Sequence, residues 1–413
     1  MTPTPRAVAF LAFAALTALW LPRTAAVAAM TVVAAFTVAD AWTVRRPPDV
    51  ERRLPKVLAR GATADLRVVP VTTHRVTVHQ PAAPGILIEP AVAADRLDAT
   101  VSATLRGRHV LGPVSLRVFG PLGLAAWYHR VGSPVEVHVY PDLPQAARIA
   151  ADVRTGRFAE DGRHRRGPLG IGTELESIRD YQPDDDIRQV NWPATLRCGR
   201  PMSNQYRTEQ DRSILCLVDL GRLMATPVGD ATRLDLALDA AVAVAAVADA
   251  VGDRVGLVAF DDQVRRRVSP RRDGGRAFVD AVWDLQPSSV DADYELAFQI
   301  AAGSKRSLVV VFTDLFDEVA ARPLVSAIGV LTRHHAVTVA SVRDPAIDEA
   351  LGRPPADVGD AVAAGVAAEL EASARLAAAR LTGAGAAVVS SAPDRLAGDV
   401  VGSYLRAKRR ARL

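Results

Sequence analysis

The sequence predicts an α/β protein built on a parallel sheet, preceded by a small β-sandwich and an N-terminal two-helix transmembrane hairpin. Three observations support this fold class. Two uncharged apolar runs come first, short alternating stretches divided by Pro and Gly fill the middle, and strand-like and helix-like segments alternate in the second half. We therefore expect four regions: a hairpin at 1–45, a β-sandwich-like module at 46–145, a linker at 146–212 and the α/β domain at 213–413.

Composition limits the classes to which the chain can belong. Of its 413 residues, 49% are hydrophobic and 23% charged, which is ordinary for globular proteins and argues against wholesale disorder. The net charge of +4 comes mainly from arginine, a bias that fits either nucleic-acid recognition or the coding bias of a GC-rich genome. The two cysteines, Cys198 and Cys216, are too few for a disulfide framework or a cysteine zinc site.

The apolar runs at 7–21 and 24–39 predict two membrane helices. Each is slightly short against the ~20 residues of a spanning helix, and extending the second past Asp40 to Val44 gives an acceptable length. Asp40 is awkward in a membrane segment, but it lies about one turn from the end and could reach the interface. Trp20 and Trp42 lie near the ends of the runs, where indoles prefer the headgroup region.

The alternative to a hairpin is a secretory signal peptide cleaved near Ala25–Ala29. The second apolar run, which ends at Arg45-Arg46, looks like a stop-transfer arrangement and favours the hairpin. Basic residues dominate the segment that follows: Arg45, Arg46, Arg52, Arg53, Lys56 and Arg60, against Asp49 and Glu51. The positive-inside rule then predicts a two-pass protein of the cell membrane with cytoplasmic soluble domains, and this basic stretch suits anionic headgroups.

Residues 63–141 predict strands of a small β-sandwich, because short apolar stretches alternate with polar residues and are interrupted by Pro and Gly. The histidines here are scattered among the strands and predict no catalytic cluster.

The second half predicts a parallel sheet covered by helices. The expected strands are 213–219, 254–260, 264–268, 307–312, 336–342 and 386–389, and the expected helices are 232–251, 275–285, 293–302, 323–334, 359–382 and 394–410. Function in such sheets gathers at the carboxyl ends of the strands, which places Asp219, Asp261-Asp262 and Thr313-Asp314 together.

The segment 174–197 carries dense charge of both signs. Asp184–Asp186 could bind a hard cation, or the arginines with Tyr181 and Trp192 could stack on nucleic-acid bases. We favour a third interpretation, an ion-pair network that holds this segment against the α/β domain, because the ligand spacing for the other two is incomplete.

This segment resembles the signature of the DUF58 family. The matching residues are Glu174, Arg179, Tyr181, Pro183, Asp185, Asp186, Arg188, Trp192 and Arg197, while Asp184, Asn191 and Leu196 replace the usual Gly, Asp and Ala. We expect the charged and aromatic residues of this set to form an interaction surface. The resemblance also implies a bacterial protein with a membrane hairpin, a β-rich region and a von Willebrand factor A-like (Rossmann-type) domain.

The von Willebrand A family builds a Mg²⁺ site from D-x-S-x-S after the first strand, a later Thr, and an Asp after the fourth strand. Here the first motif reads Asp219-Leu220-Gly221-Arg222-Leu223 and lacks both hydroxyls, whereas Asp314 is in place. Ser289 or Asp291 could substitute for the Thr. We expect a degenerate metal site in which Asp219 and Asp314 cap turns and pair with Arg222 or with the charged segment, and no cofactor.

The sequence contains no nucleophile elbow, zincin helix, P-loop or dinucleotide fingerprint, so we expect no enzyme. The basic tail at 406–412 fits lipid headgroups or an acidic partner better than nucleic acid. The leading hypothesis is a membrane-anchored adaptor that works with a MoxR-type AAA+ ATPase, the partner that the resemblance implies, in chaperone-like or cell-envelope assembly. The alternative is a Mg-dependent binding or hydrolytic protein that uses the strand-end aspartates. The oligomeric state stays open.

Overall fold

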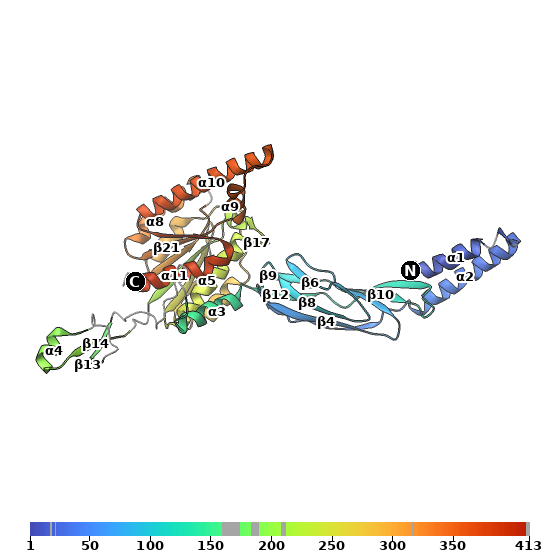
Figure 1. Cartoon of the computed structure of the whole chain (residues 1–413), viewed down its shortest axis with the longest axis horizontal. Coiled ribbons are helices and arrows are strands. Elements are labelled where there is room, and N and C mark those ends of the chain that lie inside the picture. Colours follow the sequence, from blue (N-terminus) through green and yellow to red (C-terminus); the bar gives the residue numbers. More distant parts are fainter. Residues whose placement is uncertain are drawn as a thin grey trace. The chain divides into compact units, whose positions relative to one another are not determined.

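The computed structural model describes residues 1–16, 19–20, 22–158, 174–182, 190–207, 212–315 and 318–409. For residues 23, 174–177, 205–207 and 318–320 it describes the backbone alone. The chain divides into two compact units, Met1–Tyr140 and Pro141–Leu413 (Figure 1). Together they make a mixed α/β protein with several sheets, as the sequence predicts.

The first unit begins with two apolar helices, α1 (Pro5–Leu16) and α2 (Arg23–Thr43), which lie side by side (Figure 1). Among the described residues, α2 is the one helix long and apolar enough to cross a membrane, over Thr24–Thr43. At ~1.5 Å per residue, α1 falls well short of the ~30 Å hydrocarbon core. The structure thus contains one helix of spanning length where the sequence predicted two.

A β module follows, with most strands buried on alternate residues. Its strands are β2 (Asp49–Arg53), β3 (Val57–Ala59), β4 (Thr63–Val71), β5 (Val76–His79), β6 (Ile86–Glu89), β7 (Val92–Ala94), β8 (Leu97–Ala103), β9 (Gly107–Leu111), β10 (Val114–Phe119), β11 (Ala125–Val131) and β12 (Val135–Tyr140). They form sheets in the orders β2-β4-β8-β6, β3-β12-β9 and β1-β11-β10-β5-β7, where β1 is Thr2–Pro3. Side chains of different sheets share one core, which contains Leu66, Leu97 and Leu116.

Asp40, near the end of α2, joins the helices to the β module. Its Oδ1 accepts a hydrogen bond from the N–H of Leu122 (2.8 Å), and its Oδ2 accepts from Leu124 (2.8 Å) and Ala125 (2.9 Å). Asp40 is buried against this turn. A Cβ on Gly120 would lie 2.3 Å from this carboxylate, so the turn between β10 and β11 needs glycine there.

The second unit contains a sheet in the order β19-β18-β15-β20-β21-β22. These strands are β15 (Ser213–Asp219), β18 (Arg254–Phe260), β19 (Val264–Arg271), β20 (Leu308–Phe312), β21 (Ala336–Val342) and β22 (Ala387–Ser391). All neighbours pair in parallel except β18 and β19, which form an antiparallel pair at one edge. The predicted parallel-containing sheet is confirmed.

Helices cover both faces of this sheet. One buried cluster collects side chains of α3 (Leu143–Arg154), α5 (Arg233–Ala250), α6 (Gly275–Val282) and α11 (Pro393–Arg409). The other collects α7 (Tyr294–Ala302), α8 (Glu318–Thr332) and the later part of α10 (Val358–Gly383). The chain also forms α9 (Pro345–Gly352) and the helical turn η3 (Arg222–Ala225), neither of which the sequence predicted. The short strands β16 (Pro227–Val228) and β17 (Ala231–Thr232) precede α5.

The charged segment folds locally. Strand β13 (Glu174–Asp180) pairs antiparallel with β14 (Met202–Arg207), and α4 (Trp192–Cys198) lies between them in the chain. The Asn191 side chain begins α4 by accepting from the N–H of Ala194 at 2.9 Å, and its amide donates to Asn204 at 2.7 Å. Asn191, a departure from the family signature, therefore serves as a helix cap.

Candidate functional site

The site lies where the strand order of the large sheet reverses. From β15 the chain first builds β18 and β19 on one side, and then returns to build β20, β21 and β22 on the other. Connections that leave in opposite directions open a crevice at the carboxyl ends of the two central strands. Asp219 ends β15, and Thr313-Asp314 follows β20, so the structure brings these predicted residues to one edge.

Asp219 is buried and its oxygens are already bonded. Its Oδ2 accepts from the hydroxyls of Thr313 and Tyr294, each at 2.7 Å, and its Oδ1 accepts from the N–H of Gly221 at 2.6 Å. Burial raises the pKa of Asp219 although these donors work in the opposite direction. Burial, and after it the charge of Asp219, raises the pKa of the Tyr294 hydroxyl well above its usual value, which keeps this hydroxyl a donor.

Asp314 pairs with Arg233, the first residue of α5. The Nη1 of Arg233 lies 2.7 Å from Oδ1 of Asp314 and donates to the Val342 carbonyl at 2.9 Å, and both charged side chains are 3% exposed. A capping box between Thr232 and Asp235 fixes the start of α5 and so positions this arginine. The pair is fully inside the protein, where loss of one partner is far more costly than loss of a surface pair.

Arg222 does not pair with Asp219 or Asp314, which corrects the expectation from sequence. Its Nε donates to Asp291 at 2.6 Å, and the two side chains are 58% and 75% exposed. The backbone N–H of Arg222 donates to the carbonyl of Val290, so the chain leaves the strand at this turn. The side chain of Arg222 is exposed there. Arg222 and Asp291 thus form a surface ion pair at the rim of the site.

The donor set as arranged does not fit Mg²⁺. A hard cation needs several free oxygen ligands, but Asp219 accepts three hydrogen bonds and Asp314 carries an arginine. Within the described residues, no group of three or more His, Cys, Asp or Glu side chains is arranged to hold a metal ion. Asp261, predicted at the same edge, is bonded to Arg265 at 2.7 Å and to the N–H of Gln263.

A surface hollow of about 520 Å³ lies beside this edge. One wall is acidic and comes from Asp291, Asp293 and Glu295 around the start of α7, where Asp293 caps the helix by accepting from Leu296. The other wall is formed by α8, with Pro323, Ser326, Ala327 and Val330. This hollow is an accessible surface next to the buried Asp219 and Asp314.

The structure describes only part of the predicted signature surface. Arg179 donates to the carbonyl of Asp180 at 3.0 Å, Arg197 donates to that of Pro193 at 3.2 Å, and Trp192 is 64% exposed. The N–H of Tyr181 donates to the Pro201 carbonyl. Asp185, Asp186 and Arg188 lie outside the described residues, and only the backbone of Glu174 is described. The predicted ion-pair network with the α/β domain stays a prediction.

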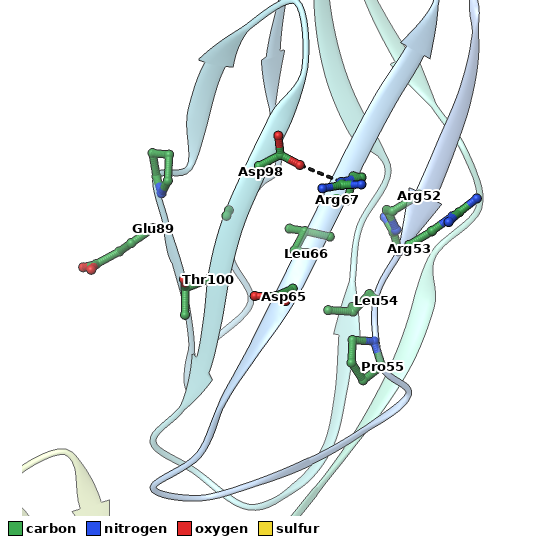
Figure 2. A pocket seen from close by; sticks show the side chains of 12 residues that line it. Arg52, Arg53, Leu54, Pro55, Asp65, Leu66, Arg67, Glu89, Asp98 and Thr100 are labelled. Atoms are coloured by element: carbon green, nitrogen blue, oxygen red, sulfur yellow. Dashed lines mark hydrogen bonds and ion pairs between the residues drawn. The ribbon is translucent and has the colours of Figure 1, made fainter.

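A larger hollow, of about 920 Å³, lies on the four-stranded sheet of the β module (Figure 2). Two rows of cross-strand neighbours line it. One row aligns Arg53 and Arg67 with Asp98, and the other aligns Asp65 with Thr100. Arg67 and Asp98 lie 2.7 Å apart but are 62% and 40% exposed. Ion pairs this exposed contribute little, so the strand-end edge with its buried carboxylates is the better candidate.

Two residues of the site were not foreseen. Tyr294 follows the cap residue Asp293, and its hydroxyl spans to Asp219 across 75 residues of sequence. Arg233 reaches Asp314 across 81 residues. The one available signal was that Arg233 directly follows the cap residue Thr232 of a Thr-x-x-Asp capping pattern, which fixes the direction of the first helical turn.

Comparison with known proteins gives a partial match. The family model described as "Protein of unknown function DUF58" matches residues 177–377, a little less than half of the chain. Uncharacterized proteins of Mycobacterium tuberculosis and Mycobacterium bovis are 27% identical over 201 residues, which is 47% of this chain and 60% of theirs. The chain therefore matches less than two thirds of the length of these relatives.

Among solved structures, a cohesin module from a Clostridium perfringens family 33 glycoside hydrolase aligns with 22% of this chain and 96% of its own. The identity is 11% and the TM-score 0.17, so this likeness carries no argument.

Proposed function

We propose that this protein is a membrane-anchored, non-catalytic adaptor whose von Willebrand A-like domain faces the cytoplasm and works with a MoxR-type AAA+ ATPase, in chaperone-like or cell-envelope assembly. One observation carries the proposal: the edge where such a domain would hold its metal is closed by the chain's own side chains. Asp219 is held by two hydroxyls and Asp314 by Arg233, which leaves a protein-contact surface and no open coordination position.

The von Willebrand A-like assignment is supported by the sheet. Counted along the chain, Asp219 follows the first strand of the sheet and Asp314 follows the fourth, the positions that this family uses for its acidic ligands. Five strands pair in parallel and one edge strand is antiparallel. The DUF58 match over 177–377 covers most of this sheet and supports the same assignment.

The rim of the closed edge offers features suited to a protein partner. Val290 is 38% exposed beside the Arg222–Asp291 pair, and the hollow of about 520 Å³ adds an acidic wall and an apolar wall. Mixed polar and apolar surface of this kind is typical of non-obligate interfaces. Any use of ATP would then belong to the partner.

Two-pass insertion is supported by the short strand β1. Thr2 and Pro3 pair with Ala126 and Ala125 of β11, and the N–H of Thr4 donates to the Leu124 carbonyl. The start of α1 and the end of α2 therefore meet the same end of the β module, so an intact hairpin must enter and leave the membrane on one side. The basic residues after α2 favour the cytoplasm as that side.

Co-purification from native membranes with crosslinking tests the proposal. We expect an AAA+ ATPase to be recovered with the wild type, and recovery to fall when the exposed pair is changed by Arg222→Glu. Arg353→Glu is the matched control, because Arg353 forms an exposed ion pair with Glu349 far along the chain from this rim. If crosslinking recovers no AAA+ ATPase, the partner assignment is wrong.

The second candidate function is Mg-dependent binding or hydrolysis by the strand-end aspartates. This function is favoured because Asp219 and Asp314 lie at the same edge of the sheet. It is opposed because their oxygens already accept hydrogen bonds from the chain itself. Calorimetric titration of the protein with Mg²⁺ and Mn²⁺ distinguishes the two candidates. Clear binding that disappears in Asp219→Ala would establish the metal function and overturn the closed-edge argument.

A further inference from the structure

The end of the β module where α1 and α2 emerge, here called the helix end, holds arginines without carboxylate partners. Elsewhere in this unit, several arginines pair with acids, as Arg67 does with Asp98 and Arg108 with Glu136. Among the described residues, no carboxylate forms an ion pair with the following arginines of the helix end: Arg6, Arg45, Arg46, Arg75 and Arg117. This end of the unit therefore carries uncompensated positive charge.

The guanidinium of Arg117 lies over two aromatic rings. Its guanidinium carbon lies 4.9 Å from the centre of the Phe119 ring and 5.5 Å from that of Tyr128, and its buried Nε has no hydrogen-bond partner. The guanidinium carbon of Arg75 lies 5.9 Å from the centre of the Phe119 ring. A guanidinium stacked in this way keeps its N–H edge directed outward, which is the geometry that binds phosphate oxygens.

The Asp40 contacts fix the position of these arginines and aromatic rings along the axis of α2. Because Asp40 lies near the end of the spanning helix and holds the amides of Leu122, Leu124 and Ala125, the turn between β10 and β11 stays level with that end. Leu122 at the turn is 55% exposed. Trp42 is 63% exposed, and Arg45 lies 4.0 Å above its ring, which is the usual arrangement of a membrane interface.

We propose that the helix end of the β module is an anionic-phospholipid binding surface. Arg75 and Arg117 bind headgroup phosphates, and Leu122 inserts at the boundary between the headgroups and the acyl chains. The acidic residues at this end, Asp40, Asp49 and Asp95, are fewer than the five arginines. Asp40 is engaged by the amides of the turn and Asp95 by the N–H of Val76. The inference rests on the proposed membrane anchoring and adds to it a lipid selectivity that a hydrophobic anchor alone would not have.

The test uses the full chain in nanodiscs of phosphatidylcholine, with and without phosphatidylglycerol, and follows amide hydrogen exchange. We expect peptides covering 114–125 to be protected severalfold more in the anionic discs, and this difference to shrink at high ionic strength. The double variant Arg75→Gln/Arg117→Gln should lose the difference. Arg130→Gln is the matched control, because Arg130 is exposed on β11 farther from the turn, and it should retain the difference.

Equal protection in both discs would overturn the lipid surface while leaving the membrane anchor intact. Failure of the chain to enter discs of either kind would overturn the anchor as well. A polyglutamate peptide added to phosphatidylcholine discs stands for an acidic protein partner. Protection by that peptide without protection by phosphatidylglycerol would also reject the lipid assignment.

Discussion

Asp40 in the first unit and the strand-end carboxylates Asp219 and Asp314 in the second unit are satisfied in different ways. In the first unit, Asp40 accepts three hydrogen bonds, all from backbone N–H groups of one turn. In the second unit, Asp219 is held largely by hydroxyls and Asp314 by a guanidinium, each from an element far away in the sequence. Asp253 follows the second pattern, with the Tyr404 hydroxyl and the Lys408 ammonium (2.7 Å) as donors from α11.

This difference determines what each carboxylate stabilises. A carboxylate bound to the amides of one turn orders that turn and attaches it to a helix, whatever side chains the turn carries. A carboxylate bound to distant side chains joins secondary-structure elements, and its contribution depends on the identity of its partners. Replacement of one partner should therefore be most costly in the α/β unit, where a charge would be left buried.

Arg233→Met should produce the largest effect. It leaves Asp314 buried without its partner, and breaking such a pair costs about 3–5 kcal/mol of unfolding free energy. Chemical denaturation of the full chain in detergent measures this. The double variant Arg233→Met/Asp314→Leu removes both charges and should recover much of the loss. A single variant as stable as the wild type would show that the pair is not the main support of this edge.

Asp40→Ala should destabilise the first unit by about 2–3 kcal/mol, because buried backbone donors lose their acceptor. Hydrogen exchange should locate the change at the amides of Leu122, Leu124 and Ala125. Asp49→Ala is the control, since Asp49 is exposed at the start of β2. If both variants exchange alike, the Asp40 carboxylate does not order the turn.

The raised pKa of Asp219 predicts a pH effect of definite sign. Burial favours the protonated carboxyl in the folded state, so its stabilising contribution is complete below the unfolded value of about 3.9 and is lost as pH rises through the folded pKa. Asp219→Asn stays neutral throughout. The unfolding free energy of the variant relative to the wild type should therefore improve as pH increases from acid to neutral, and a constant difference would contradict the raised pKa.

Arg222→Ala should have the smallest effect, below about 0.5 kcal/mol, because its pair with Asp291 is exposed and screened by solvent. The same denaturation measurement applies. A cost comparable with that of Arg233→Met would restore the original expectation that Arg222 neutralises the strand-end aspartates.

The sequence predicted the sheet of the second unit well, because each parallel strand is a continuous apolar run. β15, β18 and β20 are buried along almost their whole length, which gives a strong local signal. The same runs end in Asp219 and Thr313-Asp314, so the location of the candidate site was also predictable. Helix α8 begins at Glu318, before the expected start at Pro323, so Pro323 lies inside the helix, where it removes one backbone hydrogen bond.

The ion-pair and hydrogen-bond partners of the polar side chains could not be predicted, because they depend on which elements approach one another in the folded chain. Arg222 is closer to Asp219 in sequence than any other arginine, yet its turn directs it to Asp291, while Arg233 is directed inward by the start of α5. Strand β1 has two residues, too few for any periodicity. Asp40 appeared to be a flaw in a membrane segment because the turn it binds lies some 80 residues further along the chain.

The pairing of β1 with β11 imposes an order on assembly. Under the proposed two-pass insertion, the ribosome makes Thr2–Pro3 and both apolar helices well before Ala125–Val131, so the hairpin would enter the bilayer while its first strand still lacks a partner. Only when β11 emerges do β1, Thr4 and Asp40 find their acceptors and donors. The β module would then hold in place helices that had already inserted, and a hairpin inserted in the wrong orientation would leave β1 without its partner strand.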